Sequence, residues 1–127
     1  MKELFLPYKL AMIAKEKGFN NLCFAAYDNN KHFLWASEVA QVQFFKNSDT
    51  IEKCCTALLY QQVVDWFREK HNIEVSVKSW KNEGDGKVIY VYSNKILGLP
   101  STFRFDFKSE LYYETLNKAI EEAFNLI

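Results

Sequence analysis

A change of hydrophobic spacing in the second half of the sequence constrains the fold more than any other feature. Thr56 is a suitable N-cap for a helix over 57–71, in which apolar residues recur every three or four positions. The stripe that they form consists of Leu59, Val63, Trp66 and Phe67. The next two segments, Ile73–Trp80 and Lys87–Ser93, have the two-residue period of strands, and residues 82–86 between them contain two glycines. This pattern predicts a helix followed by an antiparallel hairpin.

A third strand and a closing helix complete this half of the chain. Thr102–Phe107 alternates in such a way that three phenylalanines share one face, with Arg104 and Asp106 on the other. Ser109 is a suitable N-cap for the C-terminal helix. The core stripe of that helix is predicted to be Tyr112, Leu116, Ala119, Ile120, Ala123 and Ile127. Residues 56–127 are therefore expected to run helix, three strands, helix.

The first half predicts a similar succession of elements. Pro7–Lys17 has helical spacing, with a proline suited to the first turn and a glycine directly after the last residue. Leu22–Tyr27 and His32–Ala36 are expected to be two strands of a hairpin, because the four residues between them include two asparagines, which tolerate positive φ. Val39–Phe45 alternates apolar and polar residues and is predicted to be a further strand.

The predicted order is α-βββ-α-βββ-α, which is the order of an α+β fold. Strands joined by short turns pair antiparallel, so we expect one or two antiparallel sheets covered by helices in a sandwich. The chain has 127 residues, which suits one domain and is short for two. Residues 49–55 form the one plausible seam, and the apolar content on both sides predicts a single domain over 1–127.

Charge and cysteine content limit the classes of function. The chain has 16 basic and 16 acidic side chains, and this neutral balance argues against a protein whose main role is to bind nucleic acid or an anionic membrane. Three cysteines, two of them adjacent, do not form a disulfide framework. Charged residues interrupt the apolar run near the N-terminus, and no stretch approaches the roughly 20 apolar residues that span a bilayer. We therefore expect a cytoplasmic protein without a membrane anchor.

Reactive residues are few, and each has an ordinary structural explanation. Cys54 and Cys55 would need further ligands at suitable spacing to hold a metal ion, and the simpler interpretation is two small residues that lead into a helix. A catalytic cysteine would need His32 or His71 as a base, and His71 is explained as a residue at a helix C-terminus. We accordingly predict no catalytic residue, no metal site and no cofactor.

Two further patterns resemble sites but have simpler explanations. Asp65 and Glu69 lie one helical turn apart, although no Glu-x-x-His motif accompanies them, so they are expected to be solvated acids beside Arg68. The sequence from Gly84 to Lys87 resembles a phosphate-binding loop, but it leads into a strand rather than a helix. We interpret it as a hairpin turn.

Aromatic residues of the second-half sheet are the one candidate binding site. Lys78 and Trp80 should lie on the face of their strand opposite the inward valines, where Arg104 of the last strand is also expected to point. Both alternating sets of the middle strand are apolar. If Tyr90 and Tyr92 join Trp80, the face is an aromatic platform with two cations, which suits nucleobase stacking or a protein hot spot. The alternative is that the N-terminal half packs over this face and makes it core.

The order of elements in residues 56–127 also resembles that of a double-stranded RNA-binding domain. Such domains place lysines at the start of the second helix to contact phosphates. Here the corresponding positions include Ser109, Glu110 and Glu114, and acids would repel the RNA backbone. RNA binding therefore remains the weaker alternative.

Three sequence blocks resemble a known group of proteins. These blocks are Tyr60-Gln61-Gln62, Trp66-Phe67-Arg68-Glu69-Lys70 and the segment Tyr113–Ile127, which together span much of the second half. They are similar to small uncharacterised proteins from phages and prophages of gut Bacteroidetes, in which a proline often stands where this chain has Leu58. That family has no assigned activity. The resemblance implies a product of a mobile element in a bacterial cytoplasm.

These observations lead to three ranked hypotheses about function. The first is a non-enzymatic accessory protein that acts as a protein-interaction module with a protein partner, because no catalytic set is legible and the charge is neutral. The second is a nucleic-acid-associated protein that uses the aromatic sheet face. The third is an enzyme, whose catalytic residues would be far apart in the sequence and brought together only by folding.

Overall fold

The computed structural model describes residues 2–39, 44–100 and 104–127, and the side chains of residues 39 and 104–106 lie outside this description. Contacts divide the chain into two compact units, Met1–Val63 and Val64–Ile127. Their boundary falls inside helix α3 (Tyr60–His71) and not in the segment 49–55. The described residues form four α-helices and two three-stranded antiparallel sheets, which confirms the α+β class.

The first unit begins with a short 3-10 helix, Lys2–Leu4, followed by helix α1 (Tyr8–Glu16). Pro7 precedes α1 in an extended conformation, and Gly18 ends the turn after it with a φ of +97°. A side chain at that φ would be strained, so the glycine explains why the helix stops there. The helix predicted over residues 7–17 is thus confirmed.

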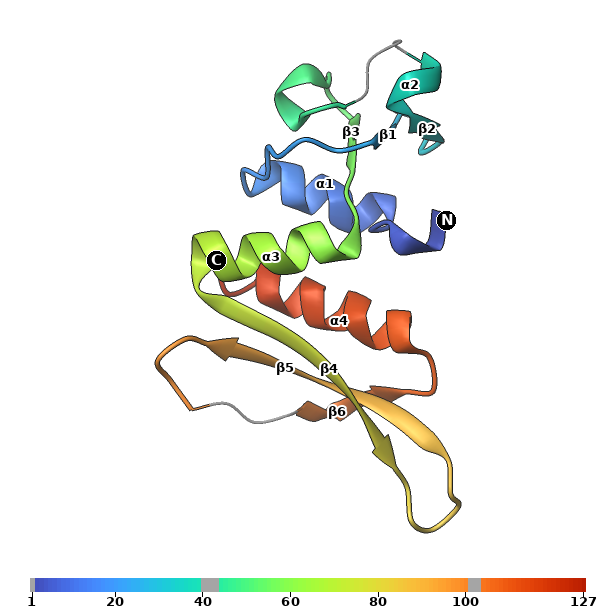
Figure 1. Ribbon diagram of the computed structural model, residues 1–127, viewed down its shortest axis with the longest axis vertical. Coiled ribbons are helices and arrows are strands. Elements are labelled where there is room, and N and C mark those ends of the chain that lie inside the picture. Colours follow the sequence, from blue (N-terminus) through green and yellow to red (C-terminus); the bar gives the residue numbers. More distant parts are fainter. Residues whose placement is uncertain (1, 40–43, 101–103) are drawn as a thin grey trace. The chain divides into compact units, whose positions relative to one another are not determined.

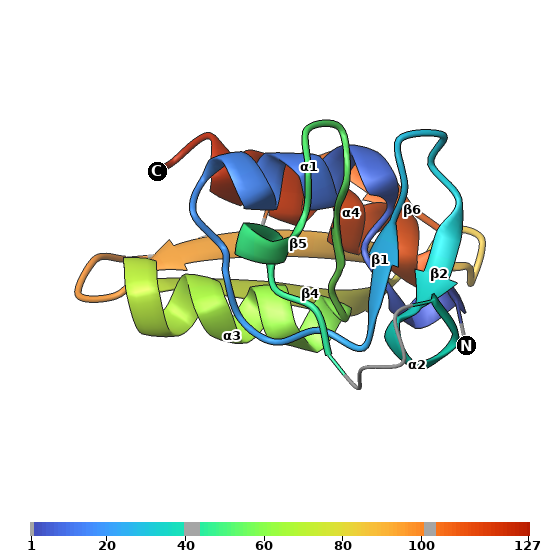
Figure 2. The same ribbon diagram turned by 90° about the horizontal axis from the view of Figure 1, so that it is seen from above.

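The sheet of the first unit has the strand order β2-β1-β3. Strand β1 (Ala25–Tyr27) pairs with β2 (Phe33–Trp35) and with β3 (Cys55–Ala57), and Figure 2 shows β1 and β2 side by side. The predicted hairpin is confirmed, with shorter strands. In its turn the Asp28 carboxylate accepts two backbone N–H groups, and Lys31, not an asparagine, adopts positive φ at 67°.

Three expectations for the first half and the start of α3 are wrong or only partly testable. Thr56 is not an N-cap, because it is fully buried in β3 and α3 begins only at Tyr60. At the start of α3, Gln62 Oε1 accepts the backbone N–H of Leu59. Val39 ends the short helix α2 (Ala36–Val39) instead of starting a strand. Residues 40–43 of that predicted strand lie outside the described part of the chain. Phe45 does form an isolated antiparallel bridge with Cys23.

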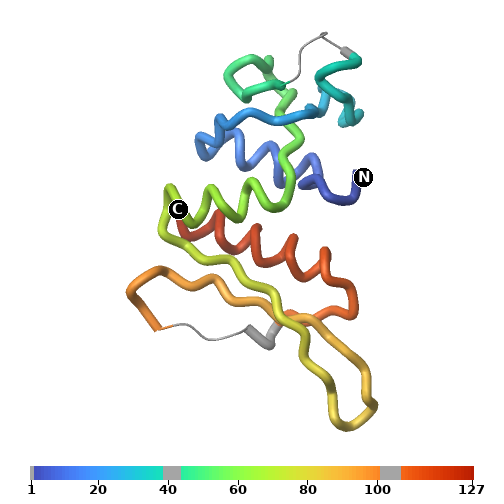
Figure 3. The backbone as a smooth tube through the Cα atoms, viewed as in Figure 1, coloured from blue at the N-terminus to red at the C-terminus, as the bar shows by residue number. Residues whose placement is uncertain are grey.

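The second unit contains the sheet β4-β5-β6, with antiparallel pairing throughout, and helix α4 in contact with all three strands. The strands are β4 (Ile73–Lys81), β5 (Val88–Ile96) and β6 (Arg104–Ser109), and the helix is α4 (Tyr112–Phe124). Figure 1 shows α4 running along the sheet, and Figure 3 shows the β4–β5 hairpin extending past the end of the helix. The predicted order of helices, strands and turns is confirmed in this half, although Thr102 and Phe103 of the predicted last strand lie outside the described residues.

Aromatic rings fill the core of the second unit. Trp66 and Phe67 on α3 are buried, and the rings of Phe67 and Phe124 are 5.0 Å apart. The α4 stripe is confirmed at Leu116, Ala119, Ile120 and Ala123. It is wrong at Tyr112, which is 43% exposed, because α4 starts one turn before the part that covers the sheet. It is also wrong at Ile127, which is half-buried and lies beyond the last residue of α4. The prediction that Ser109 is the N-cap is wrong: Ser109 ends β6, and the N-cap of α4 is Leu111, whose N–H donates to Ser109 Oγ.

Candidate interaction surfaces

The β4–β5 register decides which aromatic residues share a face. Trp80 pairs with Ile89, whereas Tyr90 pairs with Ser79 and Tyr92 pairs with Val77. Directly paired residues lie on the same face of an antiparallel sheet, and successive residues alternate. Tyr90 and Tyr92 therefore lie on the face opposite Trp80. The aromatic platform that would combine all three rings does not form.

Lys78 and Trp80 lie opposite the inward valines, as expected. The indole of Trp80 is 46% exposed, and Lys78 Nζ is 5.7 Å from the ring centroid. This is a cation–π geometry at an exposed site, worth about 0.5–1 kcal/mol. The backbone of Arg104 pairs with Tyr92 and not with a residue on the Trp80 face, and its side chain is outside the described set. Of the residues predicted to form the aromatic and cationic face, the structure brings together Lys78 and Trp80.

Tyr92 belongs to the core beneath α4. It is 1% exposed, and Asn94, two residues further along β5 on the same face, contacts the helix directly: its Nδ2 donates to the carbonyl of Ala119 at 2.8 Å. Thr115 Oγ1, also on α4, lies 3.4 Å from the carbonyl oxygen of Tyr90. Tyr92 is therefore a packing residue, and the prediction that it is part of a binding surface is wrong.

A different aromatic cluster lies where α4 begins. The rings of Tyr90 and Tyr112 meet edge to face at 5.6 Å, and those of Tyr112 and Tyr113 at 5.2 Å. Tyr112 is 43% and Tyr113 39% exposed, while Tyr90 is half-buried. Two exposed apolar residues flank the rings in the sequence: Leu111 precedes Tyr112, and Val88 lies two residues before Tyr90 on the same face of β5. We call these five residues the tyrosine surface.

The tyrosine surface has a charged border. Lys87 precedes Val88, Glu110 precedes Leu111, and Lys87 Nζ lies 3.6 Å from Glu110 Oε1. Both charged side chains are more than 60% exposed, so the pair contributes little to stability. Sequence periodicity missed this surface because it assigned Tyr112 to the buried stripe. The signal that could have found it is Leu111-Tyr112-Tyr113, an unusually apolar first turn.

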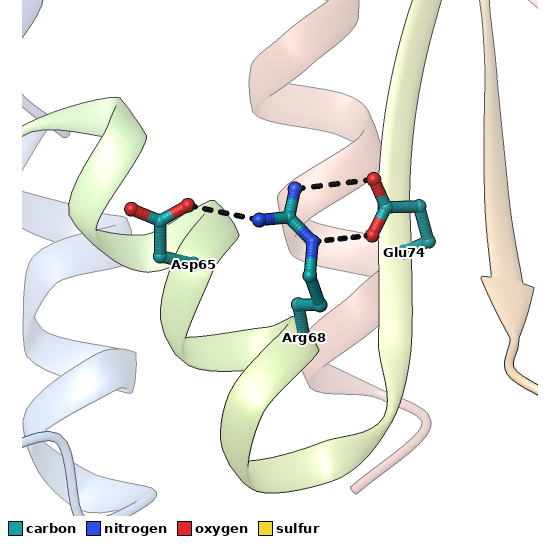
Figure 4. A network of polar contacts seen from close by, with 3 residues as sticks. All are labelled: Asp65, Arg68 and Glu74. Carbon is teal, nitrogen blue, oxygen red and sulfur yellow. Dashed lines mark hydrogen bonds and ion pairs between the residues drawn. The ribbon is translucent and has the colours of Figure 1, made fainter.

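The acids and the basic residue predicted on α3 have a structural role. Arg68 binds both oxygens of Glu74 on β4, with Nε–Oε2 at 2.6 Å and Nη2–Oε1 at 3.1 Å, and Nη1 lies 3.2 Å from Asp65 Oδ1 (Figure 4). The hydrogen bond and charge of Arg68 hold the pKa of Glu74 below its ordinary value. Glu69 is exposed, as predicted. This network joins the end of α3 to β4.

The thiols differ in their accessibility. Burial raises the pKa of Cys23 to about 11 and that of Cys55 to about 12, whereas Cys54 is half-buried. A thiol with a raised pKa is a poor nucleophile at neutral pH. Within the described ranges, no group of three or more histidine, cysteine, aspartate or glutamate side chains could hold a metal ion.

The Gly84–Lys87 segment is a hairpin turn, as predicted. Asn82 Oδ1 accepts the N–H of Gly84, and Gly86 adopts a φ of +73°, which favours glycine. None of the helices in the described part of the chain combines the length and the apolar character that crossing a membrane requires.

Comparison of the chain with protein-family models, with curated proteins and with solved structures gave no match. The tyrosine surface, the Lys78–Trp80 pair and the thiols must therefore be interpreted from their own chemistry.

Proposed function

We propose that this chain is a non-enzymatic protein-interaction module that binds a protein partner through the tyrosine surface. The observation that carries the proposal is the chain of edge-to-face contacts Tyr90–Tyr112–Tyr113, which ends in two well-exposed rings. On the strength of the sequence resemblance, we further propose that it acts as an accessory protein of a phage or prophage in the cytoplasm of its bacterial host.

Tyrosine suits this role for physical reasons. Each ring offers a large contact area and a hydroxyl, and only two side-chain torsions must be fixed on binding. Here mutual ring contacts already restrain Tyr90 and Tyr112, so less conformational entropy remains to be lost. Tyrosine is also enriched among the residues that dominate binding energies at protein interfaces.

The surroundings of the rings have the composition of an interface. Leu111 is 64% and Val88 46% exposed, which extends the apolar area beyond the aromatic rings. Contiguous exposed apolar residues with a polar edge are typical of interaction sites. Lys87 and Glu110 supply such an edge, with one charge of each sign, and favour a partner with a mixed polar rim.

The alternative function, association with nucleic acid, has one observation in its favour. Trp80 is exposed, with Lys78 beside its ring, and an aromatic ring with a cation can stack on a base. The start of α4 argues against it, because residues 109–114 contain two glutamates and no lysine or arginine. The two functions use opposite faces of the same sheet, so variants can separate them.

The test compares captured partners of tagged variants expressed in the native host. Wild type is compared with Tyr112→Ala/Tyr113→Ala, with Trp80→Ala, and with Leu99→Ala, which removes an exposed apolar residue elsewhere in the second unit. We expect a stoichiometric protein to be lost with the tyrosine variant and retained with the other two. Thermal unfolding of each variant checks that the fold is intact.

Two results would overturn the proposal. Retention of the same partner by the tyrosine variant would show that this surface is not used. Loss of the partner with Trp80→Ala, but not with Tyr112→Ala/Tyr113→Ala, would transfer the interaction to the opposite face.

A further inference from the structure

A cavity of about 210 Å³ lies in the first unit between the β1–β2 hairpin and the segment 49–54. Its apolar lining includes Ala26, Leu34, Phe45 and Ile51. It is smaller than the roughly 300–1,000 Å³ of sites for drug-sized ligands. An occupant would therefore be a single ring or a short chain.

The walls of this cavity are fixed by contacts with the rest of the first unit. Thr50 forms part of the lining, and its hydroxyl donates to the carbonyl of Asn47 at 2.7 Å. Lys15 Nζ donates to the carbonyls of Ile51 and Cys54 at 2.9 and 2.7 Å. These bonds hold Ile51 in place although its side chain is 73% exposed. The cavity is thus preformed, and its binding cost is correspondingly small.

Two carboxylates stand at the cavity. Asp28 lines the cavity, and its Oδ1 accepts the backbone N–H groups of His32 and Asn30. These hydrogen bonds, chiefly the one from His32, lower the pKa of Asp28, so this carboxylate is ionised at neutral pH. Asp49 is exposed, and its Oδ2 accepts the backbone N–H of Lys46. Asp28 Oδ2 lies 3.4 Å from Nδ1 of His32, and among the described residues no lysine or arginine side chain forms an ion pair with either acid.

We propose that this cavity binds a small organic cation, a primary amine carried on a short apolar or aromatic body. The apolar lining receives the body of the ligand, because burying hydrocarbon there removes it from water. The ammonium group then lies near Asp28 and Asp49, whose negative charge lacks a lysine or arginine partner in the described structure. A neutral ligand of the same shape would lose this attraction, and an anion would be repelled.

The test uses three matched probes: 2-phenylethylamine, 2-phenylethanol and 3-phenylpropionate. Binding is followed by amide NMR shifts in residues 26–34 and 49–54 and by the rate at which iodoacetamide alkylates Cys54. Cys54 lines the cavity and is half-buried, whereas Cys23 and Cys55 are buried and serve as internal controls. We expect the amine to shift these amides and slow the alkylation, the alcohol to bind at least threefold more weakly, and the anion not to bind.

A pair of variants isolates the charge. Asp49→Asn keeps an oxygen that can accept the Lys46 N–H, and it should weaken the amine about threefold while leaving the alcohol unchanged. Asp85→Asn is the matched control, because Asp85 Oδ1 likewise accepts a backbone N–H in an exposed turn but lies in the second unit. Absence of amine binding, equal binding of amine and alcohol, or an equal effect of the two variants would each overturn the proposal.

Discussion

Replacement of Asn47 by alanine is the sharpest test of how the first unit is held together. Asn47 is 5% exposed, and its side chain makes three hydrogen bonds to other elements. Nδ2 donates to the carbonyl of Phe19 at 2.6 Å, and Oδ1 accepts from the N–H and the hydroxyl of Thr56 at 2.9 and 3.1 Å. One side chain thus links β3 to the chain that follows α1.

The expected loss of stability follows from these three bonds. Each buried hydrogen bond contributes about 1 kcal/mol net, and a buried partner left unsatisfied costs about 1–3 kcal/mol. Phe19 and Thr56 are fully buried, so solvent does not readily replace the amide. Asn47→Ala should therefore lower the free energy of unfolding of the first unit by about 3 kcal/mol or more.

The assay is urea unfolding followed by the amide NMR signals of β1, which report on the first unit alone. The matched control is Ser48→Ala, because Ser48 is exposed and bonds to Asn20 through its backbone N–H. The amide of Thr56 should also exchange faster with solvent in Asn47→Ala. A loss below about 1 kcal/mol, or one equal to that of Ser48→Ala, would refute the role of Asn47.

Three further predictions concern the second unit. Trp66→Ala should destabilise it by about 3–5 kcal/mol, because Trp66 is 5% exposed. Trp80→Ala should cost less than about 1 kcal/mol, because Trp80 is 46% exposed. Urea unfolding compares the two variants, and similar losses of stability would contradict the assigned burial. The ion pair of Glu74 with Arg68 should stabilise most above the ordinary carboxyl pKa of 4.5 and be lost as pH falls through the lowered pKa of the folded state. Glu74→Gln should therefore flatten the acid limb of stability against pH by less than about 1 kcal/mol, and Glu69→Gln should not; an equal effect of both would refute the pair.

Local sequence patterns predicted the second unit well. Its strands follow a clear two-residue period, and the predicted Ile73–Trp80 became Ile73–Lys81. The glycine-containing turn defined the hairpin, and α4 shows its stripe at helical spacing. These elements are set by neighbours along the chain, so periodicity alone finds them.

The errors in the first half have a different cause. Cys55–Ala57 is buried on both faces and is only three residues long, so it has no alternation to distinguish it from the start of a helix. It becomes a strand by pairing with β1, some thirty positions earlier in the sequence. Long-range pairing of this kind overrides local propensity.

The candidate site was partly predictable for a similar reason. The exposed Lys78–Trp80 pair follows from alternation along one strand. The position of Tyr92 depends on which set of β5 residues faces α4, and both sets are apolar, so the sequence alone left it open. The tyrosine surface depends on where α4 meets the sheet, and tertiary packing decides that.

The proposed function is tested most directly by capture of the tagged chain from its native host, with and without nuclease, followed by mass spectrometry. We predict a stoichiometric protein partner that survives nuclease and is lost with Tyr112→Ala/Tyr113→Ala. Partners that disappear on nuclease treatment, or nucleic acid in the eluate that is lost with Trp80→Ala, would contradict it and favour association with nucleic acid.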